Sequence, residues 1–459
     1  MGFTDEHLIP LVDQGLGNSA YLVDLGNGSA LAVDASRDLR TLRAAAERRG
    51  LTVAFAADTH LHADFLSGAV QLGHDAAATV LASAAGHRTF PHVALAEGDE
   101  VDLGGLTLRA LATPGHTDEH LSFLLLDGAV ELGVFTGGSL IVDSAARTDL
   151  LGPERTEELA RAQYRSLRRL ATLPDHLPVW PTHGAGSFCA APPGAARTTT
   201  IGAQKQSNPL LAAPTEDAFV AELLAGLGTY PVYFTRLAER NRTGPRVLSG
   251  PPLLPLLDAA RIKQLLADGG HVVDVRPAVE FAAGHIPKAL SIPLRDQFAT
   301  WLGWLLPDTA PLAFVTGAGQ DLNELVWQAY KIGYERLAGH LDGGMRAWRD
   351  AQGPVTATTL VTADQTGSRP YLDVRQYAEF TAGHVPGAAH IELGDLAGLA
   401  AEAPHGALVA CGRGERAMTA ASILERAGRT DLAVLSGGPA DYARAHGRPL
   451  VDGTEAAHS

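Results

Sequence analysis

The C-terminal half of the chain contains an internal repeat with a period of roughly one hundred residues. Residues 273–289 carry the blocks Asp-Val-Arg, Glu-Phe and Gly-His-Ile-Pro, and residues 372–388 carry them again in the same order, with Val in place of Ile. A Gly-Gly pair near the end of each copy agrees with this alignment, at residues 343–344 and 437–438. Separated blocks that recur in order predict two tandem copies of one small α/β domain.

These blocks resemble the rhodanese domain, and the resemblance covers essentially all of residues 256–453. We predict one rhodanese-like α/β domain at residues 256–352 and a second at residues 358–453. Each copy contains an Asp-x-Arg element that we expect to form a structural ion pair beside the sheet, namely Asp274 with Arg276 and Asp373 with Arg375.

The second copy places a cysteine between a predicted buried strand and a predicted helix. Residues 407–410 are apolar and lead into Cys411-Gly412-Arg413-Gly414-Glu415-Arg416, and the helix follows. Backbone N–H groups at a helix N-terminus stabilise a thiolate, and Arg413 and Arg416 add positive charge for an anionic sulfur donor. The rhodanese resemblance implies that Cys411 accepts a sulfane sulfur as a persulfide and passes it on.

The first copy has no cysteine at the corresponding place. Its strand at residues 312–315 leads into Thr316-Gly317-Ala318-Gly319-Gln320, so a threonine stands where the thiol is expected. Because a hydroxyl group cannot carry sulfane sulfur, we predict that this copy is a non-catalytic structural module.

The N-terminal half alternates short strands with helices. The pattern predicts a hairpin around Asn27-Gly28, and then helices and strands at residues 39–49, 103–112, 121–127 and 154–173. The composition becomes rich in Gly and Pro between residues 241 and 255. This shift marks a boundary, so we predict an N-terminal domain at residues 1–245.

Histidines at three places in that domain suggest a metal site. His60 and His62 follow the apolar run at residues 53–56, and alternate residues of an extended segment face the same way. Two Gly/Pro-containing turns each supply one more histidine, His116 and His183. Imidazole is a common metal ligand, so we expect these side chains to converge.

The three segments keep the order and spacing of the metallo-β-lactamase superfamily, and Thr59–Gly68, His183–Cys189 and Thr200–Pro209 resemble its persulfide dioxygenase branch. This resemblance implies an α/β multidomain chain in which an αββα sandwich precedes the two rhodanese-like domains. It also implies one Fe(II) per chain, with zinc as the alternative metal, and a homodimer or homotetramer. Phe65 replaces a ligand of the second metal position, which favours a mononuclear site.

One expected ligand is absent. The family holds iron with two histidines, here His60 and His116, and the Asp of a Thr-Gly-Asp turn, but this chain has Gly138 at that position. Three arrangements remain open: a site of His60, His62 and His116; a carboxylate supplied by Asp64 or Asp143; or a domain without metal. We expect the substitution Gly138→Asp to strengthen iron binding.

The resemblance implies oxidation of a low-molecular-weight persulfide, such as glutathione persulfide, by O2 to sulfite and thiol. Cys411 would then pass sulfane sulfur, for example by joining it to sulfite as thiosulfate. Cys189, six residues after His183, either lies near the metal and carries persulfide or is a packed thiol under a loop.

Two other functions stay open. One is a zinc-dependent thioester hydrolase like glyoxalase II, although Phe65 and Gly138 both remove parts of a two-metal site. The other is a degenerate metal domain that acts as a scaffold, so that only the sulfurtransferase reaction at Cys411 remains.

Composition narrows the partners and the compartment. A net charge of -15 disfavours binding to nucleic-acid phosphates. No apolar run approaches the length of a membrane span, and the N-terminal residues do not resemble a signal peptide. The two cysteines lie far apart in sequence, which favours a reducing cytoplasm over a disulfide framework.

Overall fold

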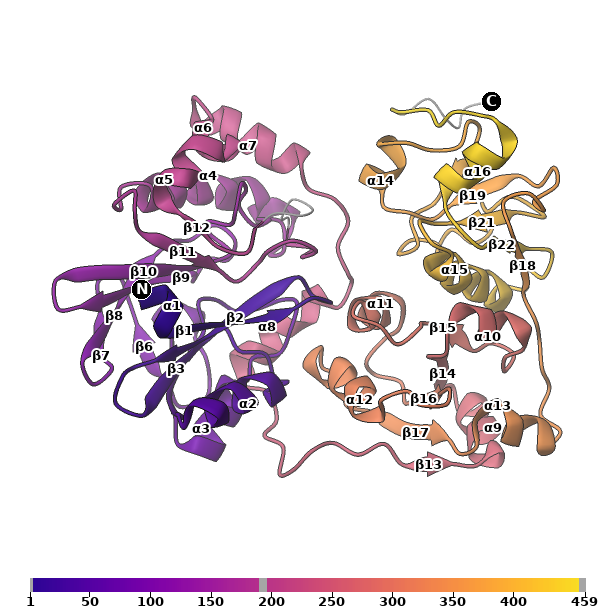
Figure 1. The fold of residues 1–459 in the computed structure, drawn as a ribbon, viewed down its shortest axis with the longest axis horizontal. Coiled ribbons are helices and arrows are strands. Elements are labelled where there is room, and N and C mark those ends of the chain that lie inside the picture. Colours follow the sequence, from indigo (N-terminus) through magenta and orange to yellow (C-terminus); the bar gives the residue numbers. More distant parts are fainter. Residues whose placement is uncertain (1–2, 190–195, 454–459) are drawn as a thin grey trace. The chain divides into compact units, whose positions relative to one another are not determined.

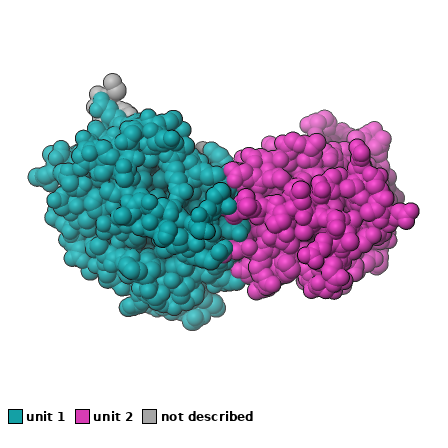
Figure 2. All heavy atoms as spheres, turned by 90° about the horizontal axis from the view of Figure 1, so that it is seen from below, with its two compact units in different colours: residues 1–251, 327–333 teal, residues 252–326, 334–459 magenta. Residues whose placement is uncertain are grey.

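A computed structural model of the chain describes residues 3–189 and 196–453 (Figure 1). The chain divides into two compact units, coloured separately in Figure 2. The first unit contains residues 1–251 together with 327–333, and the second contains residues 252–326 and 334–459.

The first unit is built on two six-stranded sheets. The strands of one sheet, in spatial order, are β1 (Leu8–Asp13), β2 (Asn18–Asp24), β3 (Ser29–Val33), β4 (Thr52–Ala57), β5 (Thr79–Ser83) and β6 (Val93–Leu95). Those of the other are β12 (Thr199–Thr200), β11 (Pro178–Pro181), β10 (Val130–Gly137), β9 (Leu121–Asp127), β8 (Leu106–Ala112) and β7 (Glu100–Asp102). The helical segments are α1 (Phe3–Glu6), α2 (Arg40–Arg49), α3 (Ala69–Ala76), η1 (Ala84–Gly86), α4 (Pro153–Leu170), α5 (Ile201–Ser207), α6 (Pro209–Ala212), α7 (Glu216–Ala225) and α8 (Phe234–Thr243).

Strand alternation explains how these elements stack into layers. On β2, Tyr21 and Val23 join the core between the two sheets, whereas Leu22 packs with residues of α2 and α3 on the outer face. On β9, Phe123 faces the inner core and Leu124 faces a third core that includes α4 and α7. Three apolar layers separate helix, sheet, sheet and helix, which confirms the predicted αββα sandwich.

The second unit contains two five-stranded parallel sheets of the same topology. The first has the order β13 (Leu256–Leu257), β17 (Leu337–Leu341), β16 (Leu312–Val315), β14 (His271–Asp274) and β15 (Leu290–Ser291). The second has the order β18 (Thr359–Val361), β22 (Ala433–Leu435), β21 (Leu408–Ala410), β19 (Tyr371–Asp373) and β20 (Ala389–His390). The identical strand order shows that the sequence repeat is a repeat of structure.

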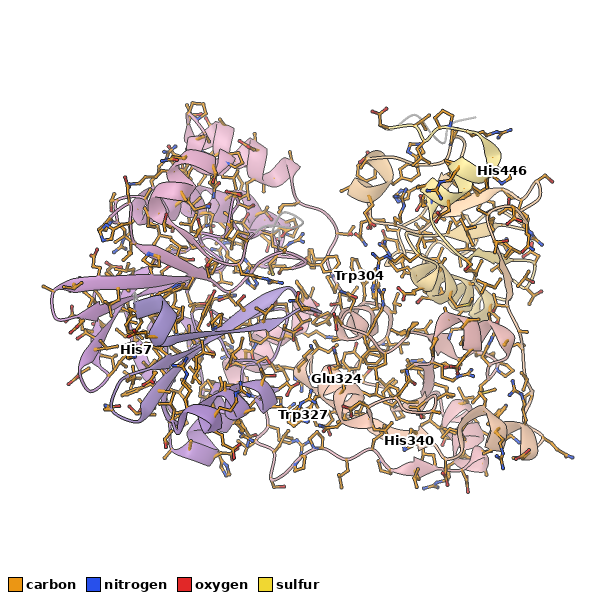
Figure 3. The ribbon with its side chains drawn as sticks, in the orientation of Figure 1. His7, Trp304, Glu324, Trp327, His340 and His446 are labelled. Carbon is orange, nitrogen blue, oxygen red and sulfur yellow. The ribbon has the colours of Figure 1, made fainter. Side chains whose placement is uncertain are left out.

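Each of these two sheets is connected to helices, and side chains lie between the helices and the strands (Figure 3). They are α9 (Ala259–Ala267), α10 (Ala278–Ala283), α11 (Phe298–Leu305), α12 (Leu322–Lys331), α13 (Gly344–Asp350), α14 (Tyr377–Thr381), α15 (Glu415–Arg426) and α16 (Pro439–His446). The expected ion pairs are present, with nitrogen–oxygen distances of 2.6 Å for Arg276–Asp274 and 2.7 Å for Arg375–Asp373.

Most of the predicted elements appear where the sequence patterns placed them. The β2–β3 hairpin and β9 are confirmed. The strand predicted from residue 103 begins instead at Leu106, because Gly104 and Gly105 adopt positive φ angles of 90° and 134° in a turn. Within the described residues, no helix has the length and apolar character that crossing a bilayer requires.

Candidate metal centre and thiol site

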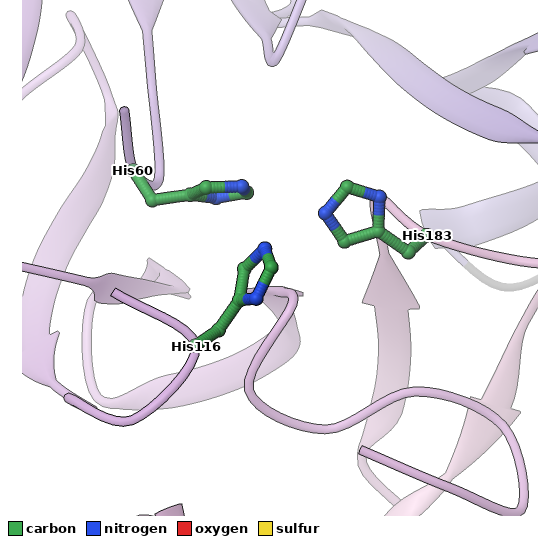
Figure 4. A group of neighbouring side chains, drawn as sticks. All are labelled: His60, His116 and His183. Carbon is green, nitrogen blue, oxygen red and sulfur yellow. The ribbon is translucent and has the colours of Figure 1, made fainter. Parts of the chain in front are cut away.

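Three histidines from separate loops point toward one another in the first unit (Figure 4). His60 follows β4, His116 lies between β8 and β9, and His183 follows β11. One ring nitrogen from each lies within 4.8 Å of those of the other two, and all three side chains are buried. Loops that follow strands of both sheets therefore bring the three imidazoles into a single cluster.

Hydrogen bonds fix which nitrogen of each ring faces the cluster. His60 Nδ1 lies 2.8 Å from Thr59 Oγ1, which itself donates to Asp34, so the ring nitrogen is the donor. His116 Nδ1 donates to the carbonyl of Arg147 at 2.7 Å, and His183 Nδ1 donates to Asn18 Oδ1 at 3.0 Å. Each imidazole thus keeps the lone pair of Nε2 for a ligand.

Burial keeps these rings neutral. It lowers the pKa of His60 well below the usual value, and the neighbouring His62 and His116 lower it further. It also lowers the pKa of His116 and His183 to about 3; His183 adds to the shift of His116, and the neighbouring His62 adds to both. Neutral imidazole is the form that binds a metal ion.

Two buried ring nitrogens without hydrogen-bond partners indicate that the cluster suits a metal ion. His60 Nε2 and His183 Nε2 are both buried and have no hydrogen-bond partner among the described residues. A buried polar atom without a partner costs free energy, and a cation bound at this point removes that cost. Neutral nitrogen donors of this kind suit zinc, copper, nickel or iron.

His62 lies beside the cluster, but its ring is held by Asp34. Its ring centroid is 4.1 Å from that of His60, and its Nε2 lies 3.2 Å from Asp34 Oδ1. β4 ends at Ala57, before both histidines, so strand alternation does not decide which way their rings face. The residue that joins His60 and His116 in one ligand group is His183.

Of the two predicted carboxylate ligands, Asp64 lies near the histidine cluster and Asp143 does not belong to it. Asp64 is buried and accepts a hydrogen bond from Asn18 Nδ2 at 2.6 Å, and it forms another ligand group with His183 and Cys189. A third group contains Asp34, His60 and His62. Asp143 belongs to none of these groups, and its Oδ1 accepts from Gln204 and Ser207. Phe65 stacks on the ring of His62, with centroids 4.2 Å apart.

The expectation for Gly138 needs a correction. A Cβ atom built on Gly138 would lie 2.4 Å from His116 Cδ2, so the His116 ring occupies the space that an aspartate would need. The preceding Gly137 has a φ of 54°, and a Cβ there would lie 2.4 Å from His120 Nε2. This turn therefore cannot regain a carboxylate ligand without moving His116.

Sequence reasoning missed three residues that position the cluster. Asn18 bridges Asp64 and His183, and His120 Nε2 accepts the N–H of Gly138 at 3.0 Å. Asp34 accepts from Thr59, His62 and Thr182. The sequence does contain a signal for Asp34: it directly follows an apolar strand, as Asp58 does just before His60. Asn18 and His120 have no such signal.

The Asp34–His62 pair gives the fold a defined pH window. Burial would raise the pKa of Asp34, but His62 and the hydrogen bonds outweigh it and lower the pKa from 3.8 to about 2. The stability that this carboxylate adds is complete above about pH 4 and is lost as the pH falls through about 2. Burial would lower the pKa of His62, but Asp34 raises it above 6.5. The contribution of His62 is therefore complete below its ordinary pKa and is lost as the pH rises through the raised value.

The thiol of the second repeat sits in the expected strand-to-helix junction. Cys411 follows β21 and is 2% exposed, and its Sγ accepts the N–H of Gly414 at 3.1 Å, just before α15. Arg413 is exposed. Arg416, in contrast, is bound by Glu379 through two hydrogen bonds of 2.6 and 2.7 Å, so its charge is already paired.

The first repeat fills the corresponding junction with its own side chains. Gln320 Oε1 accepts the N–H of Gly317 at 2.8 Å, and Asp321 Oδ1 accepts the N–H groups of Asn323 and Glu324 at the start of α12. These backbone donors are thus already satisfied inside the loop, and Thr316 stands in the place of the cysteine.

Removing the charge of Asp34 should destabilise the first unit. We expect Asp34→Asn to lower the free energy of unfolding by about 3 kcal/mol at neutral pH, because it leaves the buried His62 without its counter-ion. Urea denaturation measures this loss. Asp175→Asn is the matched control, because its exposed pair with Lys205 contributes less than about 1 kcal/mol. Equal losses in the two variants would contradict the role given to Asp34.

Adding an aspartate at Gly138 should weaken metal binding rather than strengthen it. We expect Gly138→Asp to reduce the metal content after anaerobic reconstitution, because the new side chain must displace His116. Gly250→Asp is the control, since a Cβ at Gly250 meets nothing within 4 Å. Metal content at or above that of the unsubstituted protein would show that the turn accommodates the carboxylate.

Comparison with known proteins agrees with both halves of this architecture. A family model described as the rhodanese-like domain matches residues 258–351 and 356–445. A solved structure described as a metallo-β-lactamase from Staphylococcus aureus is 28% identical, with a TM-score of 0.67, and the match covers 73% of this chain and 98% of that chain.

Two curated relatives match shorter stretches. A hydroxyacylglutathione hydrolase of Cereibacter sphaeroides is 36% identical over 160 residues, which cover 34% of this chain and 58% of the relative. The mitochondrial persulfide dioxygenase of Mus musculus is 30% identical over 137 residues, which cover 29% of this chain and 50% of the relative. The chain therefore spans between half and three fifths of the length of these relatives. It carries an N-terminal metallo-β-lactamase fold followed by two rhodanese-like domains, and it is a homologue of a persulfide dioxygenase.

Proposed function

We propose that the chain is an enzyme of sulfur metabolism that oxidises a low-molecular-weight persulfide to sulfite in its first unit and transfers sulfane sulfur through Cys411. One observation carries the proposal: the buried, unpaired Nε2 atoms of His60 and His183 converge with His116. The homology to a persulfide dioxygenase supports the substrate class.

The three imidazoles of His60, His116 and His183 are the groups that would hold the metal. When bound there, Fe(II) supplies the redox chemistry that lets O2 react with a persulfide sulfur. The protein residues do the rest: Thr59, Arg147 and Asn18 orient the rings through their Nδ1 atoms, and burial excludes water. The balanced reaction is RSSH + O2 + H2O → RSH + SO3²⁻ + 2H⁺.

The donor set also affects which substrate fits. A ligand set of three neutral imidazoles cancels none of the positive charge of the metal, whereas a ligand set with one carboxylate cancels part of it. An anionic persulfide sulfur gains more Coulomb energy at the first kind of site. The absence of a carboxylate at Gly138 is therefore compatible with a negatively charged sulfur ligand.

The second rhodanese-like domain would act on the product. Cys411 carries the sulfane sulfur as a persulfide, and sulfite takes it in the balanced step Cys–S–S⁻ + SO3²⁻ → Cys–S⁻ + S2O3²⁻. The N–H of Gly414 stabilises the sulfur anion that remains. Because Glu379 pairs with Arg416, the exposed Arg413 is the cation that would attract sulfite or thiosulfate.

Metal loading tests the first half of the proposal. We expect protein reconstituted with Fe(II) without air to hold about one iron per chain and to consume O2 with glutathione persulfide. His60→Ala, His116→Ala and His183→Ala should each lower iron content at least about tenfold, because each removes one ligand. His74→Ala is the control, since this exposed side chain pairs with Asp75 on the surface.

The outcomes separate the candidate functions. Iron binding without oxygen consumption would contradict persulfide oxidation. The match to a hydroxyacylglutathione hydrolase favours a second candidate, zinc-dependent thioester hydrolysis. Turnover of a hydroxyacylglutathione by zinc-loaded protein, with no oxygen consumption by the iron form, would decide for that candidate.

Sulfur transfer tests the second half. We expect Cys411→Ser to abolish transfer of sulfur between thiosulfate and a thiol acceptor, because serine cannot carry a persulfide. Thr316→Ala, at the corresponding place of the first repeat, should leave the rate unchanged. Residual transfer in Cys411→Ser at the original rate would mean that another group carries the sulfur.

A further inference from the structure

The helix that follows Cys411 is covered by the cysteine-free repeat. α15 lies against β15 and α10 of the first repeat as well as against β21 and β22 of its own sheet (Figure 1). Residues 417–424 of this helix are all buried. A helix that packs only on its own sheet keeps the opposite face in water. The first repeat therefore covers the face of α15 that the second repeat leaves open.

Hydrogen bonds fix this contact at the middle and at the end of the helix. Ser422 Oγ accepts the N–H of Ser291 at 3.1 Å, and both residues are buried. Glu425 lies 2.9 Å from His285 Nε2 and accepts a hydrogen bond from Thr356 Oγ1 at 3.1 Å. These contacts hold α15 in a defined position against the first repeat.

Arg295 of the first repeat reaches the first turn of α15, beside the thiol. Its Nη1 lies 2.9 Å from Glu415 Oε2. Glu415 is the first residue of the helix, and it directly follows Gly414, whose N–H donates to Cys411 Sγ at 3.1 Å. An arginine of the cysteine-free copy is therefore paired with a carboxylate of the loop-to-helix junction that carries the sulfur.

The charges of this junction balance one another unless Arg295 is counted. Glu379 pairs with Arg416, and the carboxylate of Glu415 offsets the charge of Arg413. A carboxylate in the first turn of a helix also opposes the positive end of the helix dipole, which would otherwise attract an anion. Because Arg295 pairs with that carboxylate, the junction keeps a net positive charge.

We propose that Arg295 lets the Cys411 site accept anionic sulfur compounds by cancelling the charge of Glu415. This inference rests on the sulfur transfer proposed for Cys411, and it gives the cysteine-free repeat a part in that reaction. Thiosulfate and sulfite are anions, so an uncompensated carboxylate beside the thiol repels them. Since Arg295 acts through Glu415, it is a positioning residue and not a catalytic one.

Alkylation of Cys411 by a charged and a neutral reagent tests the proposal without any sulfur transfer. Iodoacetate and iodoacetamide react with the same thiolate, so the ratio of their rates at Cys411, followed by peptide mass spectrometry, reports the local charge. We expect Arg295→Ala to lower the iodoacetate-to-iodoacetamide ratio roughly threefold, a modest change because the ion pair is partly exposed. Glu415→Gln should raise the ratio by a similar factor.

The direction of these two changes separates charge from structure. Loss of a structural contact would move the ratio the same way in both variants, whereas loss of a charge moves it in opposite directions. Arg295→Lys should keep the original ratio, and Arg295→Ala combined with Glu415→Gln should return to it. Arg346→Ala is the control, because this exposed arginine of the first repeat pairs with Asp350 of its own helix. Equal ratios in all variants, or parallel changes in the two single variants, would overturn the proposal.

The kinetics of sulfur transfer provide a second readout. We expect Arg295→Ala to lower kcat/KM for thiosulfate at least about threefold, mainly through KM, and the loss to shrink at high ionic strength. An unchanged kcat/KM would contradict the proposal. Failure of the unsubstituted protein to transfer sulfur would contradict the function proposed for Cys411 instead, and the alkylation ratios would still decide the role of Arg295.

Discussion

The carboxylate of Asp34 is the interaction on which the metal domain depends. It follows β3, accepts two hydrogen bonds from Thr59 after β4 and one from Thr182 after β11, and faces His62. The ends of strands from both sheets are therefore joined through one buried charge. Asp34 itself adopts a φ of 52°, a conformation that is uncommon outside glycine, and these bonds hold it there.

The ligand geometry follows from that anchor. Thr59 donates to Asp34 and accepts from His60. The carboxylate of Asp34 therefore orients the His60 ring through Thr59. Thr182 immediately precedes His183 and is held by the same group. Asp34 holds His62, while burial keeps His60, His116 and His183 neutral in a ligand group that contains no carboxylate.

The sequence predicted the architecture well because periodicity and repetition are local. The internal repeat and the histidine-bearing segments were visible as patterns, and the αββα sandwich was what the family resemblance of those segments implied. The ligand set was harder, because it depends on how loops turn after their strands end. His62 was expected to bind the metal with His60; it lies in a ligand group with His60 and Asp34, but not in the group that contains His116 and His183. The pairing of Arg416 with Glu379, 37 positions away, has no local signature either.

Counting the ligands of the bound iron tests the central claim most directly. X-ray absorption at the iron edge, measured on protein reconstituted with Fe(II) without air, distinguishes imidazole from carboxylate and thiolate ligands. The convergence of His60, His116 and His183 predicts three imidazoles in the scattering of the outer shells, and two in the residual iron that the His183→Ala protein still binds. A spectrum with fewer than three imidazoles, or one unchanged in His183→Ala, would contradict this account of the site.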